Sequence, residues 1–437
     1  MYGTGDNIQP DARTDLLGIM KNLFKFLPSA LVFALCTGRL FANGFMLADQ
    51  DAFAADRGDA FVATADNPSA IYYNPAGITQ VSSNDLQGGI YGIYLHQSYR
   101  PAGSDNTYYN SKRLAAVPQG FYTHSFSKVP LTAGLGVYAP YGGSVNWPSD
   151  TGFRPIAISA TLEYLTINPT LAWKILPSLS IGGGVMANYV DLKTYQGYPA
   201  HVPGGQNNYF YFKGSGWSAG YDAGVRWQPI KQLAFGVNFR SASQVSLDGQ
   251  THFEFLPLQN HAYSSASMSM TFPWTVVAGV SYRPTSKWNL EFDANYTDWA
   301  TLGTFDLRQP NHGSLVPANM LVNYDWQPSW IFEVGATRYF KKGWHASAGY
   351  AFDENSEPNE YYTPYAADLD RHFFSVGVGS NGKRFDFDIT YQLGLGIPHD
   401  VTASQPSLQI EKGITASASG TYGFISNAVM LTAGVHF

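Results

Sequence analysis

Hydrophobic and polar residues alternate with a period of two along most of the chain, the pattern of β-strands whose two faces meet different surroundings. Residues 288–297 show it most clearly, and residues 179–189 and 385–393 repeat it. One face is apolar and rich in aromatic residues, while the other carries Asp, Glu, Asn, Ser and Gly. A soluble sandwich also alternates, but this division of residue types favours a barrel with lipid outside and water inside.

Fourteen such segments can be counted, and an even number suits a closed antiparallel barrel. The expected strands are residues 85–100, 116–128, 131–140, 158–174, 178–193, 208–228, 231–247, 262–283, 286–309, 324–340, 343–353, 371–380, 384–397 and 420–437. Short connections such as 176–177 alternate with long ones such as 141–157, as periplasmic turns alternate with outside loops. The predicted fold class is therefore all-β, a transmembrane antiparallel β-barrel of about 14 strands.

Residues 1–42 have the features of a secretory signal peptide. Two lysines precede an apolar run at 26–36 that is too short to span a bilayer, and Ala42 supplies a small residue before the cleavage point. Residues 1–19 have no such character. We therefore expect translation to begin at Met20.

Residues 43–84 differ from the rest of the chain. They are rich in Ala and Asp, which favours short helices, and the dipeptides Asn67-Pro68 and Asn74-Pro75 favour turns. The first of these dipeptides is expected to close the helical part. The segment is too short to form a core of its own, so it must pack inside or against the strands.

Composition supports a membrane barrel. Charged residues make up 13% of the chain and aromatic residues 15%, with 44 Gly. Few charges and many aromatic residues suit an apolar outer band with interfacial girdles. The net charge of −6 argues against a nucleic-acid partner. The one cysteine, Cys36, falls in the signal peptide, so no disulfide is expected in the mature chain.

A signal peptide, then Gly44-Phe45, a short helical segment, Asn74-Pro75-Ala76 and about fourteen strands together resemble the FadL family of outer-membrane channels for long-chain fatty acids and other hydrophobic compounds. Ile167-Asn168-Pro169 and Tyr296-Thr297-Asp298-Trp299 agree with that family's pattern. The resemblance covers nearly the whole mature chain.

This resemblance implies a location in the outer membrane of a Gram-negative bacterium. Residues 43–84 would form a plug, or hatch, in the barrel lumen, with Asn74, Pro75 and Ala76 anchoring it to the first barrel strand. Long-chain fatty acids or aromatic hydrocarbons would diffuse passively past the lipopolysaccharide to a pocket in the lumen and leave sideways into the membrane. The terminal Phe437 resembles the signal that the barrel-insertion machinery recognises. No cofactor and no metal are expected.

Phe45, Leu47 and Phe61 are the plug residues expected to contact ligand, with ordinary packing inside the plug as the alternative. Arg226 and Arg240 face inward by the alternation and are candidates to bind a ligand carboxylate. The alternative for these arginines is a salt-bridge network that fills a polar lumen. Its other expected members are Asp56, Arg57, Glu163, Asp222, Glu291, Asp293 and Glu333.

Gly134 and Gly136 make the third strand the candidate for the opening in the wall, because glycine permits a break in pairing. Packing of small residues is the alternative explanation for these glycines.

Two other functions remain open from the sequence. A general porin for polar solutes has the same alternation. A lipid hydrolase is suggested by Gly216-Trp217-Ser218-Ala219-Gly220, which fits G-x-S-x-G, but that motif needs a sharp strand-to-helix turn and here lies on an alternating strand. We therefore do not expect an enzyme.

Overall fold

The computed structural model describes residues 44–82, 84–198, 208–255, 260–310, 318–402, 404 and 416–437. The predicted signal peptide lies outside these residues. The strands form one antiparallel sheet that closes on itself, because β1 (Asn84–Pro101) pairs along its whole length with β21 (Gly420–His436).

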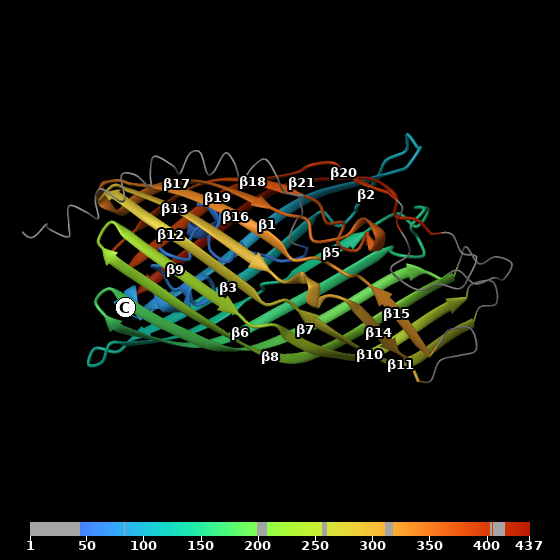
Figure 1. The fold of residues 1–437 in the computed structure, drawn as a ribbon, viewed down its shortest axis with the longest axis horizontal. Helices are drawn as coiled ribbons and strands as arrows, with labels where there is room; N and C mark the ends of the chain where they lie inside the picture. Colours follow the sequence, from blue (N-terminus) through green and yellow to red (C-terminus); the bar gives the residue numbers. More distant parts are fainter. Residues whose placement is uncertain are drawn as a thin grey trace, which may run out of the picture. The chain divides into compact units, whose positions relative to one another are not determined.

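Fourteen strands make up the wall, some of them divided into two consecutive elements (Figure 1). Between β1 and β21 the wall consists, in order, of β3 (Leu114–Ser125), β4 (Leu131–Tyr138) with β5 (Gly142–Asn146), β6 (Ser159–Leu176), β7 (Leu179–Gly197), β8 (Asn208–Ile230), β9 (Leu233–Arg240) with β10 (Ser243–Phe255), β11 (Asn260–Phe272) with β12 (Thr275–Thr285), β13 (Trp288–Thr297) with β14 (Thr304–Arg308), β15 (Asn319–Asn323) with β16 (Ser329–Tyr339), β17 (Trp344–Asp353), β18 (Arg371–Asn381), and β19 (Phe385–Gly396) with β20 (His399–Val401). The predicted fourteen-strand barrel is confirmed.

Short elements complete the connections. They are β2 (Tyr108–Tyr109) and the 3-10 helices η4 (Trp299–Thr301), η5 (Lys341–Gly343) and η6 (Asn359–Tyr361). The short turns lie at the end of the barrel that holds the C-terminus, and the long connections lie at the other end (Figure 1). Among the described residues, no helix is long and apolar enough to cross a membrane.

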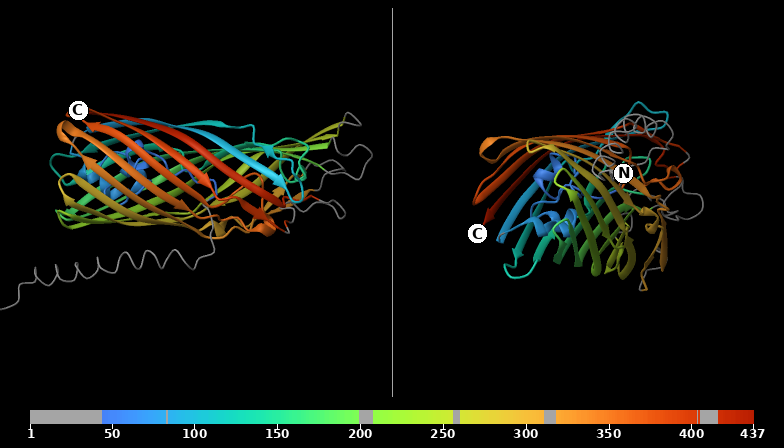
Figure 2. Two further views of the ribbon diagram at one scale, coloured as in Figure 1. Left: turned by 90° about the horizontal axis from the view of Figure 1, so that it is seen from above. Right: turned by 60° about the vertical axis from the view of Figure 1, so that its left-hand side comes forward.

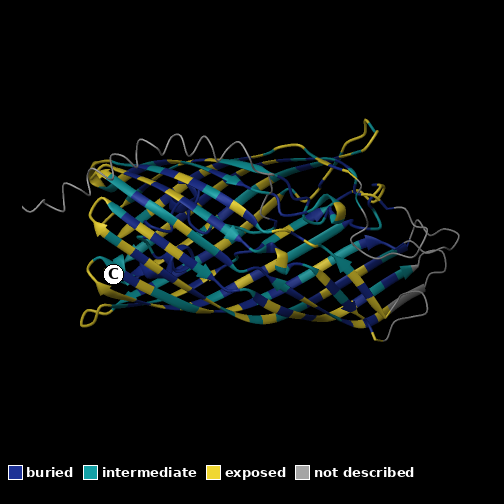
Figure 3. Cartoon of the chain, in the orientation of Figure 1, coloured by how far each residue is buried: buried dark blue, intermediate teal, exposed yellow. Residues whose placement is uncertain are grey.

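The alternation in the sequence becomes a chequered pattern of burial on the wall (Figure 3). On β13 the side chains of Trp288, Leu290 and Phe292 are exposed, whereas Asn289 and Asp293 are fully buried. Apolar residues therefore face outward and polar residues inward, the reverse of a soluble protein and the arrangement that lipid requires.

The segment from Gly44 to Ser82 lies within the barrel and is here called the plug (Figure 2). Its regular elements are α2 (Ala52–Ala55), α3 (Ala70–Tyr73) and the 3-10 helix η1 (Pro75–Gln80). Helical structure thus continues beyond Asn67-Pro68, where we expected it to end. Asn67 instead accepts a hydrogen bond from the amide of Ser69, so this dipeptide starts the second helical part.

Two wall carboxylates hold the middle of the plug. Asp293 of β13 accepts hydrogen bonds from the amides of Phe61 and Val62, each at 2.7 Å. Glu291, on the same face of β13, accepts hydrogen bonds from the amides of Ala63 and Thr64 at 2.7 and 3.0 Å. It also forms an ion pair with Arg57 at 2.9 Å. The expected salt-bridge network is in this part mainly a set of carboxylate-to-amide bonds. Glu163, expected in that network, is exposed on β6 instead.

Glycines on the wall make room for this close contact. A Cβ at Gly236 would lie 2.1 Å from the carbonyl oxygen of Val62, and one at Gly349 would lie 2.0 Å from the carbonyl carbon of Arg57. Such distances are impossible for a real side chain, so at these two positions the plug backbone can approach the wall this closely only because the wall has glycine.

Candidate functional site

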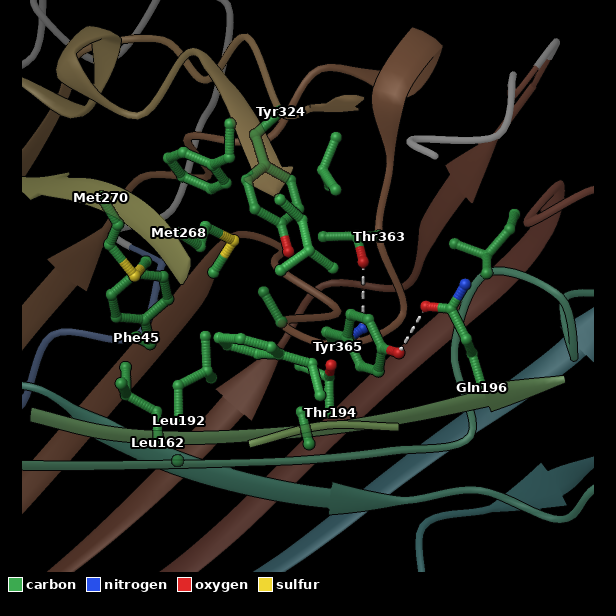
Figure 4. Close-up of a pocket in the computed structure, with 18 of the residues that line it drawn as sticks. Phe45, Leu162, Leu192, Thr194, Gln196, Met268, Met270, Tyr324, Thr363 and Tyr365 are labelled. Carbon is green, nitrogen blue, oxygen red and sulfur yellow. Dashed lines mark hydrogen bonds between the residues drawn. The ribbon is translucent and has the colours of Figure 1, made fainter. Parts of the chain in front are cut away.

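An apolar cavity of about 110 Å³ lies between the plug and the long connections, ending at Phe45 (Figure 4). One water molecule needs on the order of 10–15 Å³ on this scale, so the cavity has room for a small organic molecule or part of a longer one. Its lining residues come from the plug, seven wall strands and two connections. They are Phe45, Gly143, Ile156, Ala160, Leu162, Leu192, Thr194, Gln196, Phe210, Phe212, Met268, Met270, Phe305, Leu307, Val322, Tyr324, Trp326, Thr363, Tyr365 and Ala366.

Phe45 closes the inner end of the cavity. Its ring packs at 4.8 Å from that of Trp299 and at 5.4 Å from that of Trp326, with Tyr141 and Phe272 at about 6 Å. The preceding residue must be glycine, because its φ is +61° and a Cβ would lie 2.5 Å from Trp326. The predicted pair Gly44-Phe45 thus places an aromatic ring at the cavity.

The long connection between β17 and β18 holds the backbone of the plug at this point. Asp368 accepts a hydrogen bond from the amide of Gly44 at 3.0 Å, and Arg371 donates to the carbonyl oxygen of Gly44 at 3.1 Å. Asp368 also accepts from the amide and the hydroxyl of Ser356. The position of Phe45 is therefore fixed from the long-connection side of the barrel.

The few polar groups of the cavity are uncharged. The hydroxyl of Tyr365 donates to the side-chain oxygen of Gln196 at 3.1 Å, and Thr363 accepts from the amide of Tyr365 (Figure 4). Burial raises the pKa of Tyr365 well above its usual range, so this hydroxyl stays neutral. Among the described lining residues there is no Asp, Glu, Lys or Arg.

The other predicted plug contacts lie elsewhere. Leu47 is half-buried next to β5, where its Cδ1 would be 3.3 Å from a Cβ at Gly142. Phe61 is fully buried between Phe53 and Tyr73, with ring centroids 5.6 and 5.4 Å away. The alternative of packing inside the plug describes the surroundings of Phe61.

The two predicted arginines contact the backbone of the plug. Arg226 donates to the carbonyl oxygen of Ala63 at 2.8 Å. Arg240 donates to the carbonyl oxygen of Tyr72 at 2.9 Å and borders a second, small cavity of about 20 Å³. Neither arginine belongs to the lining of the apolar cavity, so their role in binding a carboxylate stays a prediction.

Asn74 and Pro75 lie where the plug meets β7 and β8. Asn74 donates to the carbonyl oxygens of Val62 and Val225, and a Cβ at Gly182 would lie 2.5 Å from Pro75. Ala76 follows, with its amide bonded to the side chain of Asn74. These contacts are made to β7 and β8 and differ from the expected join to β1, although β1 begins only a few residues further along the chain.

The third wall strand is interrupted, but not at its glycines. Gly134 and Gly136 are paired with both neighbouring strands, and Cβ atoms there would lie 2.7 and 2.9 Å from the side chain of Ile71. The alternative, packing of small residues, therefore explains these glycines. The interruption lies at residues 139–141, between β4 and β5.

Because of this interruption, the backbone hydrogen bonds between β3 and β4 do not continue between β3 and β5. β5 pairs with β6 alone, and within the described chain no backbone pairing joins it to residues 114–119 of β3. Asn146 closes the far end of the gap by hydrogen bonds to Ser111. The gap is here called the wall window.

The plug N-terminus is bonded to the interrupted segment. Leu47 donates its amide to the carbonyl oxygen of Pro140 at 2.9 Å, and Gly142 donates to that of Phe45 at 3.1 Å. Cavity, plug and wall window thus share the residues around Phe45.

Ser218, the candidate nucleophile, lies within β8 and its hydroxyl is 2.6 Å from that of Ser243. The sharp turn that a nucleophile of this motif needs is not formed there.

Sequence reasoning missed Thr363, Tyr365 and Asp368, which come from the connection between β17 and β18. The aromatic residues at 361, 362 and 365 in that connection were a usable signal, because exposed loops rarely carry so many.

Comparisons with known proteins agree with this geometry. The long-chain fatty acid transport protein of Escherichia coli O6:H1 is 21% identical over 458 residues, covering 95% of this chain and 98% of that protein. The structure of a Pseudomonas aeruginosa FadL homologue matches with a TM-score of 0.77 at 18% identity, covering 90% of this chain and 100% of that one. The Ralstonia pickettii toluene transporter TbuX matches with a TM-score of 0.65 at 14% identity, over 91% and 99% of the two chains.

The sequence profile of one family, described as outer membrane protein transport protein (OMPP1/FadL/TodX), matches residues 33–428. Since this match covers most of the sequence, the chain belongs to the OMPP1/FadL/TodX family of outer-membrane transport proteins.

Proposed function

We propose that this outer-membrane transporter of hydrophobic compounds carries long-chain fatty acids by passive diffusion and releases them sideways through the wall window. The observation that carries the proposal is the apolar cavity that ends at Phe45 and lies beside β5, one edge of the window. The Escherichia coli relative, similar over its full length, is a long-chain fatty acid transport protein.

Transfer free energy favours such a route. Each methylene group gains about 0.8 kcal/mol on leaving water, so a long acyl chain strongly prefers an apolar cavity to a water-filled pore. Sideways release into lipid keeps the chain out of water at the end of the route as well.

The contacts around Phe45 suggest how binding opens the window. A ligand that displaces the ring of Phe45 moves the backbone that is bonded to Pro140 and Gly142. Since these residues flank the interruption between β4 and β5, the movement reaches the edge of the window.

The test is uptake of a radiolabelled long-chain fatty acid into vesicles that contain the purified protein. Phe45→Ala is expected to lower uptake at least fivefold. Phe387→Ala is the matched control, because it removes the same ring from the outer face of β19 and should leave uptake unchanged. Equal uptake by Phe45→Ala and the wild type would refute the proposal.

Uncharged aromatic hydrocarbons are the second candidate substrates, because the described lining of the cavity has no cation to pair with a carboxylate. Competition distinguishes the two candidates. If toluene displaces bound ligand and fatty acids do not, the hydrocarbon is the substrate. The opposite result supports the fatty acid.

A further inference from the structure

Three side chains that metal ions favour meet between the plug and the wall, away from the cavity. They are Asp56 at the end of α2, His345 of β17 and Asp388 of β19. Their possible ligand atoms all lie within 4.8 Å of one another, and all three residues are buried. Among the described residues this is the one group with such geometry.

Asp56 has no partner that explains its position. It is fully buried, and neither of its carboxylate oxygens accepts a hydrogen bond. The hydroxyl of Ser347 lies nearby and is paired with that of Thr337 at 3.0 Å. A buried carboxyl without hydrogen bonds costs free energy that a ligand would recover.

His345 is also incompletely paired. Its Nε2 atom is 2.6 Å from Asp388, while its Nδ1 atom is buried without a partner. The ring of Phe53 packs against it at 4.8 Å and excludes water from that side.

The wall leaves space for the group. Gly377 and Gly379 of β18 lie beneath it, and Cβ atoms at these positions would come within 2.4 Å of Asp56 and 1.9 Å of Asp388. Because both positions are glycine, no wall side chain occupies the space beside Asp56 and Asp388.

We propose that Asp56, His345 and Asp388 bind a divalent transition-metal ion such as Zn²⁺, which joins the plug to β17 and β19. One imidazole and two carboxylates form a suitable Zn²⁺ ligand set, with a water in the fourth position. Bond lengths of about 2.0–2.2 Å place ligand atoms roughly 3.4 Å apart, so small side-chain rotations convert the observed group into the bound one.

The charged residues around Asp56, His345 and Asp388 are compatible with a bound cation. Arg57, the next residue, is engaged by Glu291. Asp51 adds a further carboxyl on the plug side. Burial, followed by the charge of Asp388, raises the pKa of Asp56 well above its usual range.

Titration of the purified full chain, without an affinity tag, tests the proposal. The protein is treated with a chelator, dialysed and titrated with ZnCl₂ in a calorimeter, and the bound metal is then measured by mass spectrometry. We expect one Zn²⁺ per chain.

Asp56→Asn and His345→Gln are each expected to weaken binding at least tenfold. Asp59→Asn is the matched control, because Asp59 is a buried plug carboxyl outside the group that is bonded to Tyr73. Heat-dependent migration on gels checks that each variant forms a barrel. Binding that is unchanged in both Asp56→Asn and His345→Gln would overturn the proposal.

A measurement on the wild type does not depend on the folding of variants. Co²⁺ in place of Zn²⁺ should give the intense visible absorption of a four-coordinate ion. A spectrum like that of hydrated Co²⁺, or less than 0.2 metal ions bound per chain, would also overturn the proposal.

Discussion

At the scale of single residues, the plug contains a carboxyl whose protonation controls its stability. Asp51 is fully buried and accepts hydrogen bonds from Asn67, Ser69 and Gln87 at 2.6, 3.1 and 2.8 Å. Burial raises its pKa to about 7, and the charge of Asp388 adds to this effect. The unfolded pKa is about 3.9, so the folded plug holds a proton that the unfolded chain loses.

The stability of the plug should therefore fall as pH rises from about 4 to about 7, by up to roughly 4 kcal/mol from this group. Below this pH range Asp51 is protonated in both the folded and the unfolded state, and above it Asp51 is ionised in both. Outside the range the stability therefore does not depend on pH through this group. Asp51→Asn should remove this pH dependence of the stability of the plug. Hydrogen exchange at the amide of Ala55, which is bonded to the carbonyl oxygen of Asp51, measures the effect. A wild type that exchanges more slowly at pH 7 than at pH 5, after correction for intrinsic rates, would contradict this sign.

The buried pair of Arg57 and Glu291 gives a second prediction at this scale. Glu291→Gln leaves Arg57 without a charged partner and weakens two amide bonds, so the plug should lose about 3 kcal/mol of stability. Glu163→Gln, on the exposed face of β6, should cost less than 0.5 kcal/mol. Hydrogen exchange at residues 61–64 compares the two. Equal protection in both variants would show that the pair does not hold the plug.

At the scale of elements, glycines of the wall decide how closely the plug approaches. Gly349→Ala should displace the plug, because the new Cβ overlaps the backbone of Arg57, and limited proteolysis should then cleave within residues 44–82. Gly143→Ala is the control, since no atom lies within 4 Å of a Cβ there. Cleavage at the same rate in both variants would be evidence against this close contact.

The wall window makes a separate prediction at the same scale. A charge at Ala116, on the unpaired edge of β3, should slow the release of ligand into lipid without weakening its binding. Ala187→Arg, on the exposed face of β7 at a position paired with both neighbouring strands, is the control for the cost of a charge in lipid. If Ala116→Arg and Ala187→Arg slow release equally, the route does not pass through the window.

At the scale of the whole molecule, the barrel closes through bonds between wall strands alone, and the plug fills its lumen. Deletion of residues 44–80 should therefore leave a barrel that closes through β1 and β21 and conducts ions far better than the full chain. Planar-bilayer conductance of the two proteins measures this. Equal conductance would mean that the plug does not block the lumen, as a general porin requires.

The barrel wall could be predicted from the alternation along the chain. Period-two alternation is a local property, and a residue that faces lipid must be apolar whatever its neighbours along the strand. For this reason each of the fourteen predicted ranges overlaps a wall strand, although β5 lies within residues 141–157, which we expected to be a connection. The pair Gly44-Phe45 was also found, but through the resemblance to the FadL family and not through the alternation.

The tertiary structure decided what no local pattern encodes. The cavity is assembled from residues more than 300 positions apart, such as Phe45 and Tyr365, and their meeting depends on how the plug and a long connection fold into the lumen. The roles of Gly134 and Gly136 depend on Ile71, and Arg226 met a plug carbonyl instead of the cavity. Alternation shows only that a side chain points inward. What it meets there is set by the packing of the plug, because the lumen brings together residues from every strand.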